Sequence, residues 1–269
     1  MNFALIPVLA VLGVAVGFMS GLFGIGGGFT IVPVLVEVFT REGFAVRHVL
    51  PTAIGTSAAT IVFTTFASAR AHHARGAVDW PIVRAMAPGL VVGSLIGPQI
   101  ASALPFGVMA AVFGSFTWLT ALRMVRSRPP VATSTLPGAF AMSAMGAVIG
   151  LVAGLVGTGG AFLAVPFLTR CNVKVHTAVA SSAAMGLPIA TAATLGYVAA
   201  GLRHSDGLPP YAIGYVYLPA VLVIVACSVV LAPVGARVAH AWSQQRLRRA
   251  FAALLAVLGA YMWWKAFGR

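Results

Sequence analysis

Two glycine clusters inside long apolar segments could bind an anion through the peptide backbone. Each glycine costs about 1 kcal/mol relative to alanine in a helix interior, so we expect each helix to break at its cluster and then restart. The first N–H groups of a restarted helix lack intrahelical acceptors and, with the helix dipole, favour a negative ligand. The candidate residues are Gly26, Gly27, Gly28, Phe29 and Thr30 in the first cluster and Thr158, Gly159, Gly160 and Ala161 in the second. The alternative is a structural kink without a ligand.

Hydroxyl groups near these breaks could add donors. Thr30 and Thr158 belong to the clusters themselves, and a second matched segment supplies four more hydroxyls, at Thr56, Ser57, Ser181 and Ser182. A small anion could accept hydrogen bonds from several of them. The alternative for each is a bond back to a carbonyl of its own helix, as Ser and Thr often make in membrane helices.

Other chemistries find no support in the residues. The segment Gly24-Ile-Gly26-Gly27-Gly28-Phe29 lacks the last glycine of the dinucleotide fingerprint, and the chain has no phosphate-loop Gly-Lys-Ser/Thr sequence. Its four carboxylates do not pair as general acid and base, so we do not expect an enzyme. We expect no metal and no cofactor. Cys171 and Cys227 lack metal-ligand spacing and are assigned to packing. Glu37 could carry protons or lie at the membrane rim.

The composition places the chain in a membrane. Hydrophobic residues make up 60% and charged residues 8% of its 269 residues, against about 25% charged residues in soluble domains. The lipid bilayer is therefore the solvent of its surface. The net charge of +13 is assigned to loops that set topology and contact anionic headgroups, and not to nucleic acid. We expect a multi-pass protein of the cell inner membrane.

The apolar segments predict an all-α polytopic protein. Windows long enough to cross a bilayer occupy residues 48–69, 81–103, 106–124, 176–200, 212–234 and 248–266. Residues 3–40 and 138–170 are apolar but broken by the glycine clusters. No basic residue precedes the apolar run from Phe3 to Met19, so we expect a retained helix and not a signal peptide.

An internal repeat divides the chain into two halves. Gly13, Gly17, Gly21, Gly24, Gly26 and Gly27 recur 133 positions later as Gly146, Gly150, Gly154, Gly157, Gly159 and Gly160. With the apolar matches, residues 13–35 contain 11 identities in 23 positions. Thr52–Ala59 likewise matches Thr177–Ala184. This indicates duplication, with residues 1–128 as the first membrane repeat, 129–136 as a linker and 137–269 as the second.

The basic residues predict the orientation of the halves. If each glycine-broken stretch enters the membrane and returns as a hairpin, 12 of the 17 Lys and Arg residues lie on one side and 5 on the other. If each stretch crosses once, the split is 9 to 8. The positive-inside rule favours hairpins, with both termini outside. Each half is then a re-entrant or hairpin segment plus about three transmembrane helices, and the halves are inverted, with their glycine clusters meeting near the membrane midplane.

Four segments resemble the TauE/SafE family of sulfite exporters. They are Gly21-Leu-Phe-Gly-Ile-Gly-Gly-Gly-Phe-Thr-Ile-Val-Pro33, its second copy Gly154-Leu-Val-Gly-Thr-Gly-Gly-Ala-Phe-Leu-Ala-Val-Pro166, Ala53-Ile-Gly-Thr-Ser57 and Gly76-Ala-Val-Asp-Trp80. The resemblance implies a transporter of sulfite or organosulfonates and assigns the family's glycine motifs to the two clusters. Ala161 replaces the third glycine of the second motif, so the halves differ.

We therefore expect a secondary transporter, an exporter of small sulfur-containing anions, with a small anion as its partner. Two alternatives stay open. One is a passive anion channel or a permease for another anion such as thiosulfate. The other is a non-transporting membrane scaffold whose glycines serve packing alone.

Overall fold

The computed structural model describes residues 5–23, 28–126, 135–204, 206–241 and 244–268. These residues form ten α-helices and one short hairpin of two strands. The first half contains α1 (Leu5–Phe23), α2 (Gly28–Arg41), α3 (Val46–Ala74), α4 (Trp80–Ala103) and α5 (Phe106–Arg126). The second contains α6 (Ala139–Val156), α7 (Ala161–Arg170), α8 (Val175–Arg203), β1 (Ala212–Ile213), β2 (Val216–Tyr217), α9 (Leu218–Ala241) and α10 (Gln244–Phe267).

The chain is an all-α polytopic membrane protein. Six helices of the described part are long and apolar enough to cross a bilayer, namely α3, α4, α5, α6, α8 and α10. Five of the six sequence windows coincide with helices to within a few residues. The window at 212–234 is wrong at its start, because residues 212–217 form the β1–β2 hairpin and α9 begins only at Leu218. This run is rich in Tyr, Val and Ile, which suit strands as well as apolar helices.

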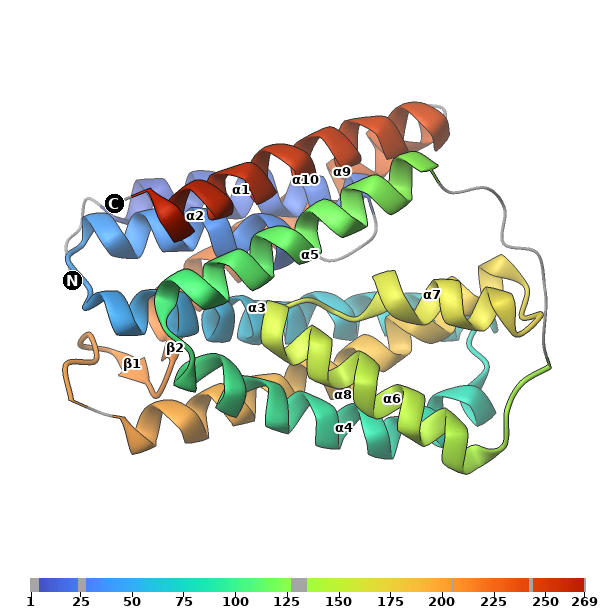
Figure 1. Cartoon of the computed structure of the whole chain (residues 1–269). Coiled ribbons are helices and arrows are strands. Elements are labelled where there is room, and N and C mark those ends of the chain that lie inside the picture. Colours follow the sequence, from blue (N-terminus) through green and yellow to red (C-terminus); the bar gives the residue numbers. More distant parts are fainter. Residues whose placement is uncertain (1–4, 24–27, 127–134, 205, 242–243, 269) are drawn as a thin grey trace.

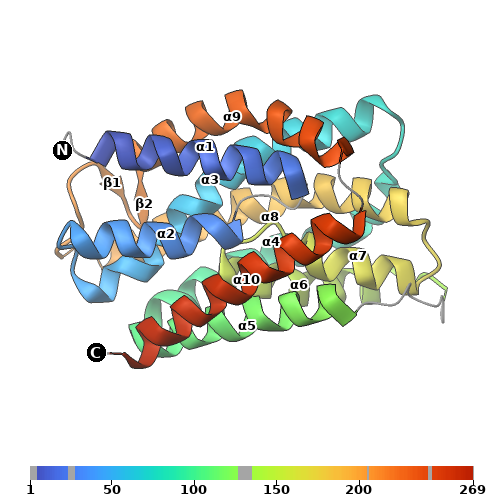
Figure 2. The same cartoon turned by 90° about the horizontal axis from the view of Figure 1, so that it is seen from above.

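The glycine-broken segments form hairpins. Helix α1 runs from one end of the bundle to its middle, and α2 returns to the end where α1 began (Figure 2). Helices α6 and α7 repeat this arrangement from the opposite end (Figure 1). The start of α1 and the end of α10 consequently lie at the same end of the molecule.

The two halves pack against each other through equivalent pairs of helices. Helix α1 packs along α9, and α6 packs along α4. Exchanging the halves turns the first pair into the second, because α1 corresponds to α6 and α4 to α9. The other large contacts join the equivalent helices α3 with α8 and α5 with α10, and also α4 with α8, whose counterpart between α9 and α3 is much smaller. The pairs α1–α9 and α4–α6 agree with a two-fold arrangement of repeats. On the opposite directions of the two hairpins we base the proposal that the repeats are inverted.

The glycine stripes bring these helices into close contact. A Cβ atom at Gly150 of α6 would clash with the carbonyl oxygen of Leu90 on α4. One at Gly13 of α1 would lie 2.8 Å from Cβ of Cys227 on α9. Small residues that let backbones approach are a common device of helix packing in lipid. The spaced glycines before each break, Gly13 and Gly17 in α1 and Gly146, Gly150 and Gly154 in α6, therefore serve helix packing.

Filling this contact should destabilise the fold. We expect Gly150→Leu to lower the unfolding free energy by about 1–3 kcal/mol or more, because the side chain has no space beside α4. Thermal unfolding of the detergent-purified protein measures the change. Gly138→Ala is the control, because a Cβ there meets nothing within 4 Å. Equal melting temperatures for the two variants would contradict the packing role.

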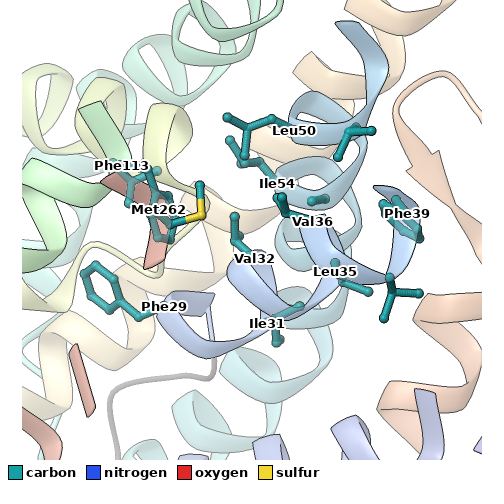
Figure 3. Packing of buried hydrophobic residues seen from close by; sticks show 14 of the residues in the cluster. Phe29, Ile31, Val32, Leu35, Val36, Phe39, Leu50, Ile54, Phe113 and Met262 are labelled. Carbon is teal, nitrogen blue, oxygen red and sulfur yellow. The ribbon is translucent and has the colours of Figure 1, made fainter. Parts of the chain in front are cut away.

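Helix α2 is short but buried on nearly every side. Its apolar residues pack against α3 at Leu50 and Ile54, against α5 at Phe113 and against α10 at Met262 (Figure 3). Figure 3 labels the contributing α2 residues Phe29, Ile31, Val32, Leu35, Val36 and Phe39. This packing fixes the start of α2 in the middle of the bundle.

Candidate functional site

The restarted helices α2 and α7 meet end to end in the middle of the bundle. A Cβ atom on Gly28, the first residue of α2, would clash with the carbonyl oxygen of Gly157 and lie 3.2 Å from Cα of Thr158. Phe29 and Phe162 occupy equivalent repeat positions, and their ring centroids lie 5.6 Å apart. From this meeting point α2 and α7 run toward opposite ends of the molecule (Figure 2). We call the contact between Gly28 and Gly157–Ala161 the glycine junction.

Two glycines in the left-handed region shape the turn between α6 and α7. Gly157 has φ +68° and closes α6 through its N–H bond to the carbonyl of Ala153, at 2.8 Å. Gly160 has φ +72°, and its carbonyl accepts the first bonds of α7, from Leu163 and Ala164. A side chain is strained at positive φ, which explains the glycines. The turn therefore aims the first N–H groups of α7 at the junction.

Thr158 carries a buried hydroxyl group in the junction. Its residue is 5% exposed, and its Oγ1 has no hydrogen-bond partner among the described residues. The neighbouring Ser57 on α3 donates its hydroxyl to the carbonyl oxygen of Gly157, at 3.3 Å. A buried polar group without a partner costs about 1–3 kcal/mol. A ligand that accepted from Thr158 would remove this cost.

Lack of a partner does not by itself identify a site. Nδ1 of His48, Oγ1 of Thr52 and Nε1 of Trp263 are also buried without a partner in the described part of the chain. Thr158 differs from these because it lies where two helix N-termini meet. Among these four described residues, Thr158 is the one whose unpaired atom lies beside backbone donors that favour an anion.

The surroundings of the junction are apolar and close. A Cβ atom added to Gly159 would lie 4.0 Å from Cγ2 of Ile61 and 3.9 Å from Cγ2 of Thr65. Gly186 of α8 lies close to Thr65 and to the carbonyl oxygen of Gly159. In such a low-dielectric setting, dipoles and hydrogen bonds act more strongly on a charge than they do in water.

The other predicted hydroxyls make bonds elsewhere. Thr56 of α3 accepts from the backbone N–H of Tyr217 at 3.0 Å, and Ser181 of α8 accepts from that of Asp79, also at 3.0 Å. Thr56 and Ser181 are equivalent repeat positions. Thr56 of α3 binds the connection that follows α8, and Ser181 of α8 binds the loop that follows α3. Thr30 faces the sulfur of Met19 at 3.8 Å, and Ser182 bonds back to the carbonyl of Ala178.

The structure thus brings together part of the predicted site. The residues that it gathers at or beside the junction are Gly28, Phe29, Ser57, Thr158, Gly159, Gly160 and Ala161. Gly26 and Gly27 lie outside the described residues. Thr65 and Gly186 also adjoin the junction and were not predicted. The signal for Thr65 is the four-residue spacing of Ser57, Ile61 and Thr65, which places all three on one face of α3. Nothing in the sequence points to Gly186.

Glu37 is held in an ionic cluster at the far end of α2. It accepts from Nε of Arg41 at 2.7 Å, from Nζ of Lys265 at 3.0 Å and from the hydroxyl of Tyr261. Lys265 and Tyr261 belong to α10, so the cluster ties α2 to that helix. A carboxylate with three donors is stabilised in its ionised form. This favours the rim position over a proton carrier.

Neutralising Glu37 should therefore affect stability. We expect Glu37→Gln to lower the unfolding free energy by about 1 kcal/mol, because the pair with Lys265 is partly exposed and solvent screens it. Thermal unfolding measures this, with Glu42→Gln as the control carboxylate. An unchanged melting temperature together with loss of proton-dependent flux would instead identify Glu37 as a proton carrier.

Comparison with known proteins gives a consistent result. Residues 9–262 match the profile of the family described as "Sulfite exporter TauE/SafE". A "Probable membrane transporter protein" of Haemophilus influenzae is 33% identical over 265 residues, which cover 98% of this chain and 100% of that protein. Similarly named proteins of Methanocaldococcus jannaschii and Bacillus subtilis (YdhB) are 26% and 25% identical, over 96% and 95% of this chain and 95% and 97% of theirs. No solved structure matches the chain significantly.

The family match spans both halves, including the hairpins that form the glycine junction. The relatives are named as membrane transporter proteins, and their similarity to this chain covers nearly their whole length. The fold is that of a multi-pass membrane protein. The chain belongs to the TauE/SafE sulfite exporter family, a family of membrane transporters.

Proposed function

We propose that this protein is a secondary transporter that exports small sulfur-containing anions, such as sulfite or organosulfonates, across the cell inner membrane. The anion binds at the glycine junction, between the N-termini of α2 and α7. The observation that carries the proposal is the buried hydroxyl of Thr158, which lacks a partner among the described residues where these N-termini converge.

The junction suits a small oxyanion. Sulfite and sulfonates each present three oxygens, which can accept from two helix N-termini and from Thr158 together. In the described part of the chain, the Lys and Arg residues lie at helix ends or in connecting loops. Backbone dipoles are therefore the positive groups available at the middle of the bundle.

Binding without a charged clamp also suits transport. A transporter must bind its substrate well enough to admit it and weakly enough to release it. Hairpins that enter from opposite ends and meet at one site match the inverted-repeat design, in which one half rocks against the other. Proximity of α2 and α7 lets such a motion open the junction to either side.

The charge distribution predicts which end faces the cytoplasm. The end of the bundle that carries Arg70, Arg75, Arg84, Arg123 and Arg126 should be cytoplasmic, with both termini outside. We expect a cytoplasm-dependent reporter fused after residue 269 to be inactive, and the same reporter fused after Arg126 to be active. Strong activity of the C-terminal fusion would contradict this topology.

Ligand-induced stabilisation tests the proposed substrate class. The purified protein is heated with sulfite, 2-aminoethanesulfonate or thiosulfate, and with chloride at equal ionic strength as the control. A ligand at one hundred times its Kd adds about 2.7 kcal/mol. We expect sulfite or the sulfonate to raise the melting temperature above the chloride value. Stabilisation by thiosulfate alone would indicate a permease for that anion, and no shift with any sulfur anion would contradict the proposal.

A further inference from the structure

A groove between α5 and α10 runs along the outside of the bundle. It is separated from the glycine junction by Phe116, which lines the groove and packs on the rings of Phe29 and Phe162. Two adjoining cavities of about 740 and 690 Å³ form it, and they share Ser115 and Leu119. The second cavity extends from Ser115 to Val125 on α5 and to Arg249 on α10. Apart from Ser115 and Arg249, its lining is apolar and includes Trp118, Leu119, Leu122, Val125, Ala253 and Trp263.

Aromatic packing joins the two helices that line this groove. The indole rings of Trp118 and Trp263 stack with centroids 6.4 Å apart, and Nε1 of Trp118 donates to the carbonyl oxygen of Ala256 at 2.9 Å. These contacts hold α5 and α10 together, and Trp118, Leu119, Leu122 and Val125 remain exposed along the groove. The groove is therefore built into the pair of helices.

Basic side chains gather at one end of the groove. Helices α5 and α10 are antiparallel, so the last turn of α5 lies beside the first turns of α10 (Figure 1). Arg249 lines the second cavity, and Arg123 and Arg126 directly follow its lining residues Leu122 and Val125. All three arginines are exposed. The groove thus has apolar walls and a positively charged end.

The length of the second cavity matches one leaflet. Ten residues separate Ser115 from Val125, which is about 15 Å of helix at 1.5 Å per residue. Half of a hydrocarbon core about 30 Å thick is also about 15 Å. A chain lying in this cavity from the mid-depth of the membrane would reach the arginines at its surface.

We propose that this groove binds an anionic phospholipid of the cytoplasmic leaflet. One acyl chain lies between α5 and α10 along Trp118, and the phosphate contacts Arg123, Arg126 and Arg249. Charge complementarity selects an anionic lipid, because each basic residue near the membrane surface adds a favourable interaction with anionic headgroups. A second copy of this chain is the competing occupant. Its own three arginines would face those of the first copy, and the like charges would repel each other.

Native mass spectrometry of the full-length protein in detergent tests the proposal. The probes are dioleoyl phosphatidylglycerol, dioleoyl phosphatidylcholine with the same chains, and glycerol phosphate without chains. We expect phosphatidylglycerol to bind at least about tenfold more tightly than phosphatidylcholine, and glycerol phosphate not to compete. Equal affinity for the two lipids, or competition by glycerol phosphate, would overturn the proposal.

Variants separate the headgroup contact from the groove. The triple change Arg123→Gln, Arg126→Gln and Arg249→Gln should weaken phosphatidylglycerol binding about tenfold or more and leave phosphatidylcholine unaffected. The matched control, Arg70→Gln with Arg75→Gln and Arg84→Gln, removes three exposed arginines from another part of the same end and should change neither. Ala253→Phe, which fills the groove, should weaken both lipids. An unchanged affinity in the first triple variant, or a dimer that Ala253→Phe dissociates, would contradict the lipid site.

Discussion

Replacing Gly28 by alanine is expected to abolish anion flux. The added methyl group would occupy the position where the start of α2 meets the carbonyl oxygen of Gly157. Either the two hairpins separate or the methyl group displaces the ligand, and in both cases the backbone donors no longer converge. Flux of sulfite in proteoliposomes measures the result, and size-exclusion chromatography with thermal unfolding establishes that the variant is folded.

Two further variants make this result interpretable. Gly138→Ala is the control, since that glycine has open space around it, and it should transport at the native rate. Gly160→Val tests the second half, because Gly160 has φ +72° and a Cβ there would lie 2.6 Å from Cδ1 of Ile189. If Gly28→Ala folds normally and transports at the native rate, the glycines form a structural kink only.

Replacing Thr158 by valine should affect stability and anion binding in opposite directions. Valine keeps the shape of threonine and removes a buried hydroxyl that has no partner in the described structure. The unfolding free energy should therefore stay the same or rise. Anion affinity should fall about 10- to 100-fold, because a hydrogen bond to a charged group contributes about 1.5–3 kcal/mol. Thermal unfolding without ligand and calorimetric titration with sulfite measure the two effects.

Thr52→Val is the matched control for this prediction. Thr52 is also fully buried, and its hydroxyl also lacks a partner among the described residues, but it lies outside the glycine junction. It should reproduce the effect on stability without any effect on anion affinity. Thr158→Ser, which keeps the hydroxyl, should retain most of the affinity. Similar affinities in Thr158→Val and Thr52→Val would remove Thr158 from the proposed site.

The sequence predicted the fold well where its physical signals were strong. Long apolar runs gave α3, α4, α5, α8 and α10, and the glycine clusters marked where the hairpins break. The charge split favoured hairpins over single crossings, and the structure has hairpins (Figures 1 and 2). These signals succeed because span length and loop charge are local consequences of the bilayer.

The site was harder to predict, because a hydroxyl's partner depends on tertiary contacts. Thr56 and Ser57 are neighbours in sequence but lie on different faces of α3. Thr56 therefore meets the backbone of Tyr217, while Ser57 meets that of Gly157. Thr65 reaches the junction from two turns farther along the same helix. Composition cannot separate these cases, whereas helical spacing from Ser57 would have selected Thr65.

The most direct test of the central claim is sulfite and organosulfonate flux in proteoliposomes of purified protein, with and without a proton gradient. The account predicts saturable flux of at least one of these anions and competition between them. This flux should be lost in Gly28→Ala but not in Gly138→Ala. Dependence on the gradient would identify proton coupling, and non-saturable flux would indicate a channel. Flux no faster than in protein-free liposomes for every sulfur anion would contradict the account.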